Sequence, residues 1–424
     1  MKRKHIFTLA LVILMVSASL SAFAADNVQL QVNGDMVPAP GLYIENDSCM
    51  IPVDNFARLA GADVRVSNAS DFAITENGET LSLSIGEKEA SLGDKLISLP
   101  VEPLKVGNTI FVPLRAVGSA FGFEVGWDGG QRLVTLTRNE TRDGMSVSDL
   151  LVKSTAASLE CNTYSMEGLF NIDMDITADG KAVDEAPKNI TSKLSGQIQN
   201  DPFQVYLSQT ITPVVENNIP EMVVETYLDQ EKMYIKIPGQ SWIVQDVPFT
   251  PEFWKQQQDI QSDPLKAVAQ MKEMGILLNY GNDVTVNGTD YYVLNATLDM
   301  DKFRQGYQNL FQQAAQGMPQ DLAPDAPADM QKQMQELFEN AVMEYNYSVL
   351  INKETLISDI ISFDARIEMT MKNPEPVVEG GEQQDGEPQE VHMKMKLNGD
   401  ITISGLGDPF NTPDLSGAKE MTIQ

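Results

Sequence analysis

The sequence predicts an α+β protein that is predominantly antiparallel β. A duplicated small β-rich domain is followed by a curved antiparallel sheet packed with helices. Two observations support this prediction. One β-rich unit occurs twice before residue 138, and beyond it strands follow one another without alternating helices, which favours antiparallel pairing. The 424 residues allow two or three domains.

The first 24 residues predict a secretory signal peptide. Three basic residues at positions 2–4 precede an apolar run from Ile6 to Val16, and Ala22-Phe23-Ala24 then forms a small–x–small cleavage pattern. An uncleaved anchor is the weaker alternative, because this apolar run is short for a membrane span. We therefore expect a secreted or cell-envelope-associated, extracytoplasmic protein with no integral membrane segment after cleavage.

The charge of the chain excludes one class of partner. It has 60 acidic and 30 basic residues, a net charge of −30. Such a chain repels the phosphates of nucleic acids, so no nucleic-acid partner is expected.

Residues 28–83 and 90–137 carry the same unit. "VNGDMV" at 32–37 corresponds to "LGDKLI" at 92–97, and both predict a strand, a turn and a strand. "NDSCMIPV" at 46–53 corresponds to "GNTIFVPL" at 107–114.

A short helix is expected next in each unit. Pro52 and Pro113 suit a first helical turn, and Gly61 and Gly122 suit a left-handed helix end. Two further strands complete each unit. Neither unit alone buries much core, so the two should pack as one domain.

The stretches "FVPLRAVGSAFGFEVGWD" and "RLVTLT", within residues 111–137, resemble the copper amine oxidase N-terminal (stalk) domain family. The resemblance covers residues 28–138 and implies a structural or adhesive module. The oxidase itself needs three copper-binding histidines and a tyrosine in an Asn-Tyr-Asp/Glu setting. The chain has two histidines, His5 lies in the signal peptide, and Gly281 follows Asn279-Tyr280. We therefore expect no catalytic residue, no metal site and no cofactor.

A polar linker at 139–147 leads to a second domain at 148–424, which begins with a helix in "SVSDLLVKSTAASLE". Alternating or apolar runs predict strands, and amphipathic runs predict helices. Flexible loops are expected at 317–329, which is proline-rich, and at 373–390, which is acidic. The expected strands are 166–176, 203–212, 222–228, 232–237, 242–245, a hairpin at 284–298, 345–352, 356–371 and 391–404, and the expected helices are 250–260, one beginning at Asp263-Pro264, 303–314 and 330–345.

Two stretches of this domain, "KMYIKIPGQSWIVQ" and "YNYSVLINKETLISDIISFDARIEM", resemble half-barrels of the Lol type and of mycobacterial lipid-carrier lipoproteins. The resemblance covers residues 148–420. It implies helices against the concave face of a curved sheet, and binding of lipid, another apolar ligand or a lipoprotein segment.

The candidate apolar-ligand-binding residues come from three strands, since strand residues two apart share a face. Methionine adapts to varied ligands, so they could line an apolar cavity. A methionine-rich core is the simpler interpretation. A Cu(I) site with His392 is the least favoured, because His392 points to the opposite face from its neighbours. The candidates are Phe170, Ile172, Met174, Met369, Met371, Met393 and Met395.

Other polar features have simple interpretations. Asp173 and Asp175 predict a solvated strand face. Cys49 aligns with the apolar Ile110 of the second unit, which favours a small buried side chain over a disulfide with Cys161. The disulfide remains open.

The sequence as a whole predicts an exported, non-enzymatic cell-envelope protein. Its stalk-type domain would mediate attachment to a cell-wall polymer or another envelope protein. The alternative is a carboxylate-based hydrolase acting on envelope polymers, because abundant acidic residues allow accidental carboxylate pairs.

Overall fold

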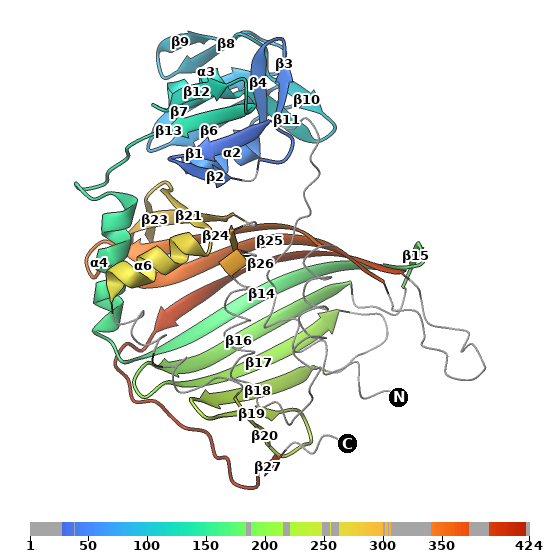
Figure 1. Ribbon diagram of the computed structural model, residues 1–424, viewed down its shortest axis with the longest axis vertical. Helices are drawn as coiled ribbons and strands as arrows, with labels where there is room; N and C mark the ends of the chain where they lie inside the picture. The colour runs from blue at the N-terminus through green and yellow to red at the C-terminus, as the bar shows by residue number, and fades with distance from the viewer. Residues whose placement is uncertain are drawn as a thin grey trace.

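Two bodies rich in strands make up the protein, as a computed structural model shows (Figure 1). The structure describes residues 28–37, 39–183, 188–214, 221–247, 255, 263–299, 302–303, 305–306, 341–372 and 390–420, with the backbone alone at 213–214, 341–344 and 371–372. Several predictions lie outside the described residues. They are the signal peptide, the loop at 317–329, the loop at 373–390 except its last residue, the helix at 250–260 except residue 255, the helix at 303–314 except residues 303, 305 and 306, and residues 330–340 of the helix at 330–345.

Residues 28–137 form three small sheets that interlock the two sequence repeats. β1 of the first unit pairs in parallel with β13 of the second, and β4 pairs with β11. The sheets are β12(Glu124–Asp128)-β13(Leu133–Thr137)-β1(Gln29–Val32)-β2(Asp35–Val37), β10(Leu104–Val106)-β11(Thr109–Pro113)-β4(Ser48–Pro52)-β3(Tyr43–Glu45), and β5(Asp63–Val66)-β6(Asp71–Glu76)-β7(Glu79–Ser84)-β8(Glu89–Leu92)-β9(Lys95–Ser98). Side chains of both units share one buried cluster, as expected for units too small to hold separate cores.

The two short helices lie where the repeat predicts them. α2(Val53–Ala60) follows Pro52 and ends at Gly61, whose φ of +70° is the left-handed cap conformation. α3(Leu114–Ala120) follows Pro113, and Gly122 just beyond it has φ of +77°.

The remaining strands form one fourteen-stranded sheet. All its pairings are antiparallel except that of β27 with β20, which confirms the predicted fold class. The order is β21(Ile276–Tyr280)-β23(Thr289–Leu298)-β24(Ala341–Asn352)-β25(Ser358–Lys372)-β26(Glu390–Ser404)-β14(Thr163–Ala178)-β16(Asn189–Gln199)-β17(Gln204–Val214)-β18(Met222–Asp229)-β19(Lys232–Lys236)-β20(Ile243–Asp246)-β27(Lys419–Glu420), with β15(Lys181–Ala182) beside β14 and β22(Val284–Val286) beside β23.

Two helices lie in front of one end of this sheet (Figure 1). α4(Val147–Leu159) begins with a capping box, in which Ser146 and Asp149 each accept a hydrogen bond from the other's backbone N–H. α6(Pro264–Glu273) begins at Asp263, whose side chain accepts hydrogen bonds from the backbone of Leu265 and Lys266.

Some elements differ from the sequence-based expectation. β16 and β21 were not predicted, because β16 places Ser192 and Gly196 among its apolar positions and weakens the alternation. Ala341 and Val342, expected at the end of a helix, lie in β24, where backbone pairing with β25 overrides their helical spacing.

Candidate functional site

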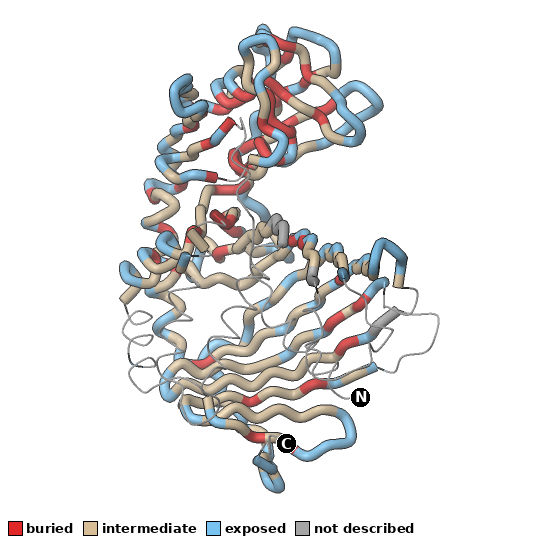
Figure 2. The backbone as a smooth tube through the Cα atoms, turned by 45° about the vertical axis from the view of Figure 1, so that its right-hand side comes forward, coloured by how far each residue is buried: buried red, intermediate tan, exposed pale blue. Residues whose placement is uncertain are grey.

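The large sheet has one apolar face and one polar face. Its register places Ile172 beside Leu397 on one side and Ile190 on the other, and Leu397 beside Ala365. One residue along, Asp173 lies beside Lys396, which pairs with Arg366. Because strand side chains alternate between faces, these rows separate apolar from charged side chains across the sheet. Figure 2 shows that most of the sheet is only partly buried.

α4 covers one end of the apolar face, with a cavity on each side. The first, here the Tyr345 cavity, encloses about 630 Å³. It is lined by α4, α6, β21, β23, β24 and β25, through Leu151, Ser154, Thr155, Ser158, Met271, Ile276, Leu298, Phe303, Tyr345, Tyr347, Val349, Ser358, Ile361 and Phe363. No charged side chain is among them.

The second, here the Tyr164 cavity, encloses about 800 Å³ at the adjoining end of the sheet. Apolar side chains from β14, β16, β17 and β26 form much of its wall, with polar groups from the loop after α4. Its lining residues are Thr155, Ser158, Leu159, Glu160, Asn162, Tyr164, Ile198, Asn200, Asp201, Phe203, Val205, Ala267, Ile357, Ser358, Ile403 and Leu406. Both volumes fall in the range of small-molecule sites, about 300–1,000 Å³.

Aromatic rings form one wall of the Tyr345 cavity. The ring centroids of Tyr345 and Tyr347 lie 5.9 Å apart, and each lies 6.2 Å from that of Phe363. Burial raises the pKa of Tyr345 to about 12 and also raises the pKa of Tyr347. The apolar surroundings thus favour the neutral phenols.

The six candidate residues whose side chains are described lie on the same apolar face of the sheet. β25 and β26 are paired, with Met369 opposite Met393. Ile172, Met174 and Met395 belong to one apolar cluster. The Phe170 ring lies 6.2 Å from that of Phe363. Met371 pairs through its backbone with Val391, and its side chain lies outside the described atoms.

None of the six candidates whose side chains are described lines either cavity. The sequence reasoning missed Tyr345, Tyr347 and Phe363 as cavity residues, although the alternation of "YNYSVL" and "ISFD" already placed them on a single strand face. It also missed the hydroxyl side chains of α4, because an amphipathic pattern does not show which face meets a cavity.

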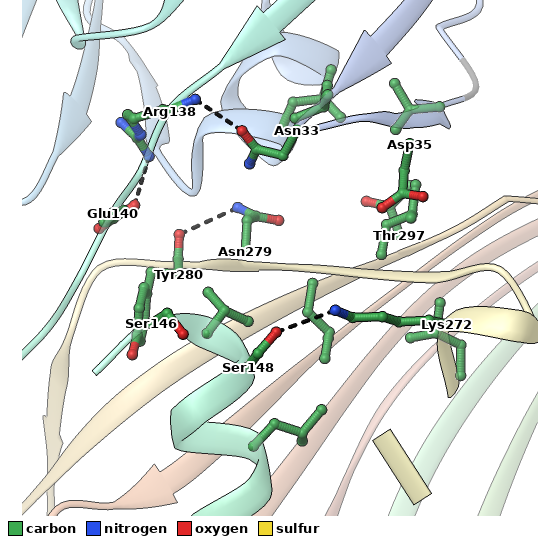
Figure 3. Close-up of a pocket in the computed structure, with 18 of the residues that line it drawn as sticks. Asn33, Asp35, Arg138, Glu140, Ser146, Ser148, Lys272, Asn279, Tyr280 and Thr297 are labelled. Atoms are coloured by element: carbon green, nitrogen blue, oxygen red, sulfur yellow. Dashed lines mark hydrogen bonds and ion pairs between the residues drawn. The ribbon is translucent and has the colours of Figure 1, made fainter. Parts of the chain in front are cut away.

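A third cavity, about 280 Å³, lies where the two bodies meet (Figure 3). A network of ion pairs lies at its wall, through Arg138 and Glu140, and extends beside it. Arg138 contacts Glu76 at 2.9 Å and Glu140 at 2.7 Å, and Arg142 contacts Glu140 at 2.5 Å and Asp283 at 2.9 Å. Burial raises the pKa of Glu76, an effect that Arg138 opposes. This network joins the two bodies.

Close backbone contact accompanies the network. Gly61 packs so tightly that a β-carbon there would lie 1.7 Å from the carbonyl oxygen of Tyr280. Asn282 donates hydrogen bonds to Asp63 at 2.7 Å and to the Thr75 carbonyl at 3.1 Å. The end of β21 is therefore docked on the first body.

The residues considered for metal binding do not come together in the part of the chain that the structure describes. Among the described residues, no group of three or more His, Cys, Asp or Glu side chains could hold a metal ion. His392 Nδ1 lies 3.0 Å from Thr370 Oγ1 on the polar face, and Asp173 and Asp175 are exposed.

The two cysteines are both free. Burial raises the pKa of Cys49 to about 11, so its thiol is neutral at ordinary pH. Trp127 is 43% exposed.

The fold and the cavities define a protein with a stalk-type domain and a half-barrel-like sheet. The copper amine oxidase N-terminal domain family matches residues 31–136, which confirms the resemblance inferred from the sequence. The family of unknown function DUF6612 matches residues 146–402, more than half of the chain, and the protein belongs to this family. No catalytic domain of an amine oxidase is among these matches.

Solved structures provide a second comparison. The chain is similar to lipoprotein LppX of Mycobacterium tuberculosis, with 10% identity over 63% of this chain and 99% of that one and a TM-score of 0.26. It is also similar to a DUF1329 family protein from Desulfovibrio piger, with 13% identity over 61% and 90% and a TM-score of 0.20.

A third structure is a domain named for outer-membrane lipoprotein sorting, from Vibrio parahaemolyticus, with 8% identity over 59% and 89% and a TM-score of 0.18. The half-barrel resemblance inferred from residues 148–420 therefore agrees with two of these structures, the mycobacterial lipoprotein and the lipoprotein-sorting domain. At these TM-scores the similarities carry no argument about function.

No curated protein matches the chain. Among the helices that the structure describes, none is both long and apolar enough to cross a membrane.

Proposed function

We propose that this is an exported, non-enzymatic envelope protein whose second domain, residues 148–424, binds an apolar ligand on the concave face of its sheet. The observation that carries the proposal is the continuous apolar face, with two cavities beside α4. An apolar surface with adjoining cavities of this kind is typical of a binding site. The candidates Phe170, Ile172, Met174, Met369, Met371, Met393 and Met395 would form the floor that continues beyond the cavities.

The hydrolase alternative has less support. Among its described lining residues the Tyr345 cavity has no carboxylate. Those of the Tyr164 cavity include two, Glu160 and Asp201, and both are exposed to solvent and not enclosed as a pair in a cleft.

Binding can be tested with an apolar fluorescent probe such as N-phenylnaphthylamine. Phe363→Asn places an amide on the cavity wall and should weaken probe binding about tenfold. Asp364→Asn changes the next residue, which is exposed on the polar face, and should leave binding unchanged. The proposal would be refuted if the wild type bound no probe. It would also be refuted if both variants bound the probe equally while circular dichroism showed that both were folded.

We further propose that the domain at 28–138, joined through 139–147, attaches the protein to a cell-wall polymer or another envelope protein. The exposed Trp127 on β12 supports a contact surface there. Retention of the protein by purified cell-wall sacculi, reduced in Trp127→Ala, is the expected result. Failure of the wild type to be retained would remove the cell-wall part of this proposal.

Export is a separate element of the proposal. When the full-length chain is expressed in bacteria, the mature protein should be found outside the cytoplasm and begin at Ala25. Cell fractionation followed by N-terminal sequencing would check this.

A further inference from the structure

The two cavities share a boundary that is lined by hydroxyl groups. Three side chains line both of them, Thr155 and Ser158 of α4 and Ser358 of β25, and all three carry a hydroxyl group. Ser154, which is 3% exposed, places its hydroxyl 3.4 Å from that of Ser358. A ligand that occupies both cavities must therefore pass these hydroxyl groups at its middle, between the apolar wall of the Tyr345 cavity and the partly polar wall of the Tyr164 cavity.

The chemistry of the walls indicates what such a ligand carries. Among the described residues that line the two cavities there is no lysine, arginine or histidine, so these residues offer an anionic group no counter-charge. The phenol hydroxyls of Tyr345 and Tyr347 have no hydrogen-bond partner within the described part of the chain. Both tyrosines are half-buried, and a phenol hydroxyl can donate a hydrogen bond, so an uncharged ligand oxygen is a suitable acceptor here.

The two cavities are large enough to hold one acyl chain each. Each volume, about 630 Å³ and 800 Å³, is that of a complete ligand site, and α4 lies between them. Each buried methylene contributes about 0.8 kcal/mol, about fourfold in affinity, so filling the second cavity would strengthen binding greatly.

We propose that the ligand is an uncharged two-chain ester lipid of the diacylglycerol kind. One acyl chain lies in the Tyr345 cavity and the other in the Tyr164 cavity, and the ester oxygens lie along Ser158 and Ser358, since the Thr155 hydroxyl donates to the Leu151 carbonyl at 2.8 Å. This inference rests on the proposed function and specifies the ligand of the same site.

The test compares a diacylglycerol with a monoacylglycerol of the same chain length. Native mass spectrometry gives the stoichiometry, and titration against a fluorescent diacylglycerol gives the dissociation constants. The wild type should bind one diacylglycerol or two monoacylglycerols.

Two variants each fill one cavity with an indole ring. Ile361→Trp narrows the Tyr345 cavity, and Val205→Trp narrows the Tyr164 cavity. Each should weaken diacylglycerol binding at least tenfold and leave one monoacylglycerol bound, which also shows that the variant is folded. Asp364→Trp, exposed on the opposite face, is the matched control and should bind as the wild type does.

The outcomes separate this inference from the proposed function. If diacylglycerol binding responds to only one tryptophan, or if the wild type takes up a single monoacylglycerol, the two-chain inference is wrong although apolar binding stands. If the wild type binds neither lipid and no apolar probe, both are wrong. A Ser158→Ala and Ser358→Ala double variant should also lose the preference of the wild type for the diester over the matching diether.

Discussion

The docking of the two domains gives the sharpest quantitative prediction, through substitution of Gly61 by alanine. Gly61 and Gly122 end equivalent helices in the two repeats, with φ of +70° and +77°. An alanine at either position adopts a left-handed conformation that costs about 1–2 kcal/mol. Only at Gly61 does the new β-carbon clash, 1.7 Å from the Tyr280 carbonyl oxygen, whereas nothing lies within 4 Å of it at Gly122.

The extra cost at Gly61 follows from the contacts that must separate. The clash is with backbone, so no side-chain rotation relieves it, and β21 must move away from α2. That movement breaks the hydrogen bonds from Asn279 to the Arg58 carbonyl and from Asn282 to Asp63 and to the Thr75 carbonyl. At about 0.5–1.5 kcal/mol each, these three bonds contribute about 1.5–4.5 kcal/mol. Gly61→Ala should therefore cost this amount beyond Gly122→Ala.

Two measurements check this difference. Urea denaturation gives the free energy of unfolding of each variant. Hydrogen exchange at the amides of β21 reports the docking locally, and it should accelerate in Gly61→Ala alone. Equal destabilisation within about 0.5 kcal/mol, with unchanged exchange at β21, would refute the view that Gly61 is required for docking.

Three further predictions concern other contacts. Arg142→Ala should lower the free energy of unfolding in urea by about 2–3 kcal/mol, because the Arg142 side chain is 8% exposed. The loss should be smaller than for an isolated buried ion pair, because Asp283 still contacts Lys353 at 2.6 Å. In the control Lys88→Ala, whose side chain is 62% exposed, the loss should be under about 1 kcal/mol, and equal losses in the two variants would contradict the network. Ser146→Ala removes the α4 capping box and should lower stability by about 1 kcal/mol, with loss of helical circular dichroism confined to α4; no change would rule out the cap. The pKa of Tyr345 is about 12 in the folded state and near 10 in the unfolded chain, so the free energy of unfolding should fall as the pH rises from 10 to 12. An absorbance titration at 295 nm should show one late-ionising tyrosine fewer in Tyr345→Phe than in the wild type. An unchanged titration would contradict the burial of Tyr345.

Much of the fold could be predicted because its signals are local. Proline and glycine mark the ends of α2 and α3 through their backbone preferences alone. Alternation marks β14, β25 and β26 because strand side chains point to opposite faces. The pairing of β25 with β26 and its register, which set Met369 opposite Met393, come from the structure.

The cavity could not be predicted in the same way. Phe170 and Met174 carry the same alternation as Tyr345 and Tyr347, yet only the tyrosines line a cavity, because α4 and α6 lie across that end of the sheet. Where a helix crosses a sheet depends on contacts between segments far apart in the chain, and no periodicity records it.

The sequence by itself determined the repeat, the amphipathic strands and the absence of the histidines that a copper amine oxidase needs. These are properties of neighbouring residues and of composition. Only the tertiary structure decided that Gly61 meets Tyr280, that Arg142 joins the two domains through Asp283, and that the hydroxyls of Thr155, Ser158 and Ser358 lie between two apolar cavities. Each of these arises because packing brings together residues that are distant in the chain, and their free energy depends on that proximity.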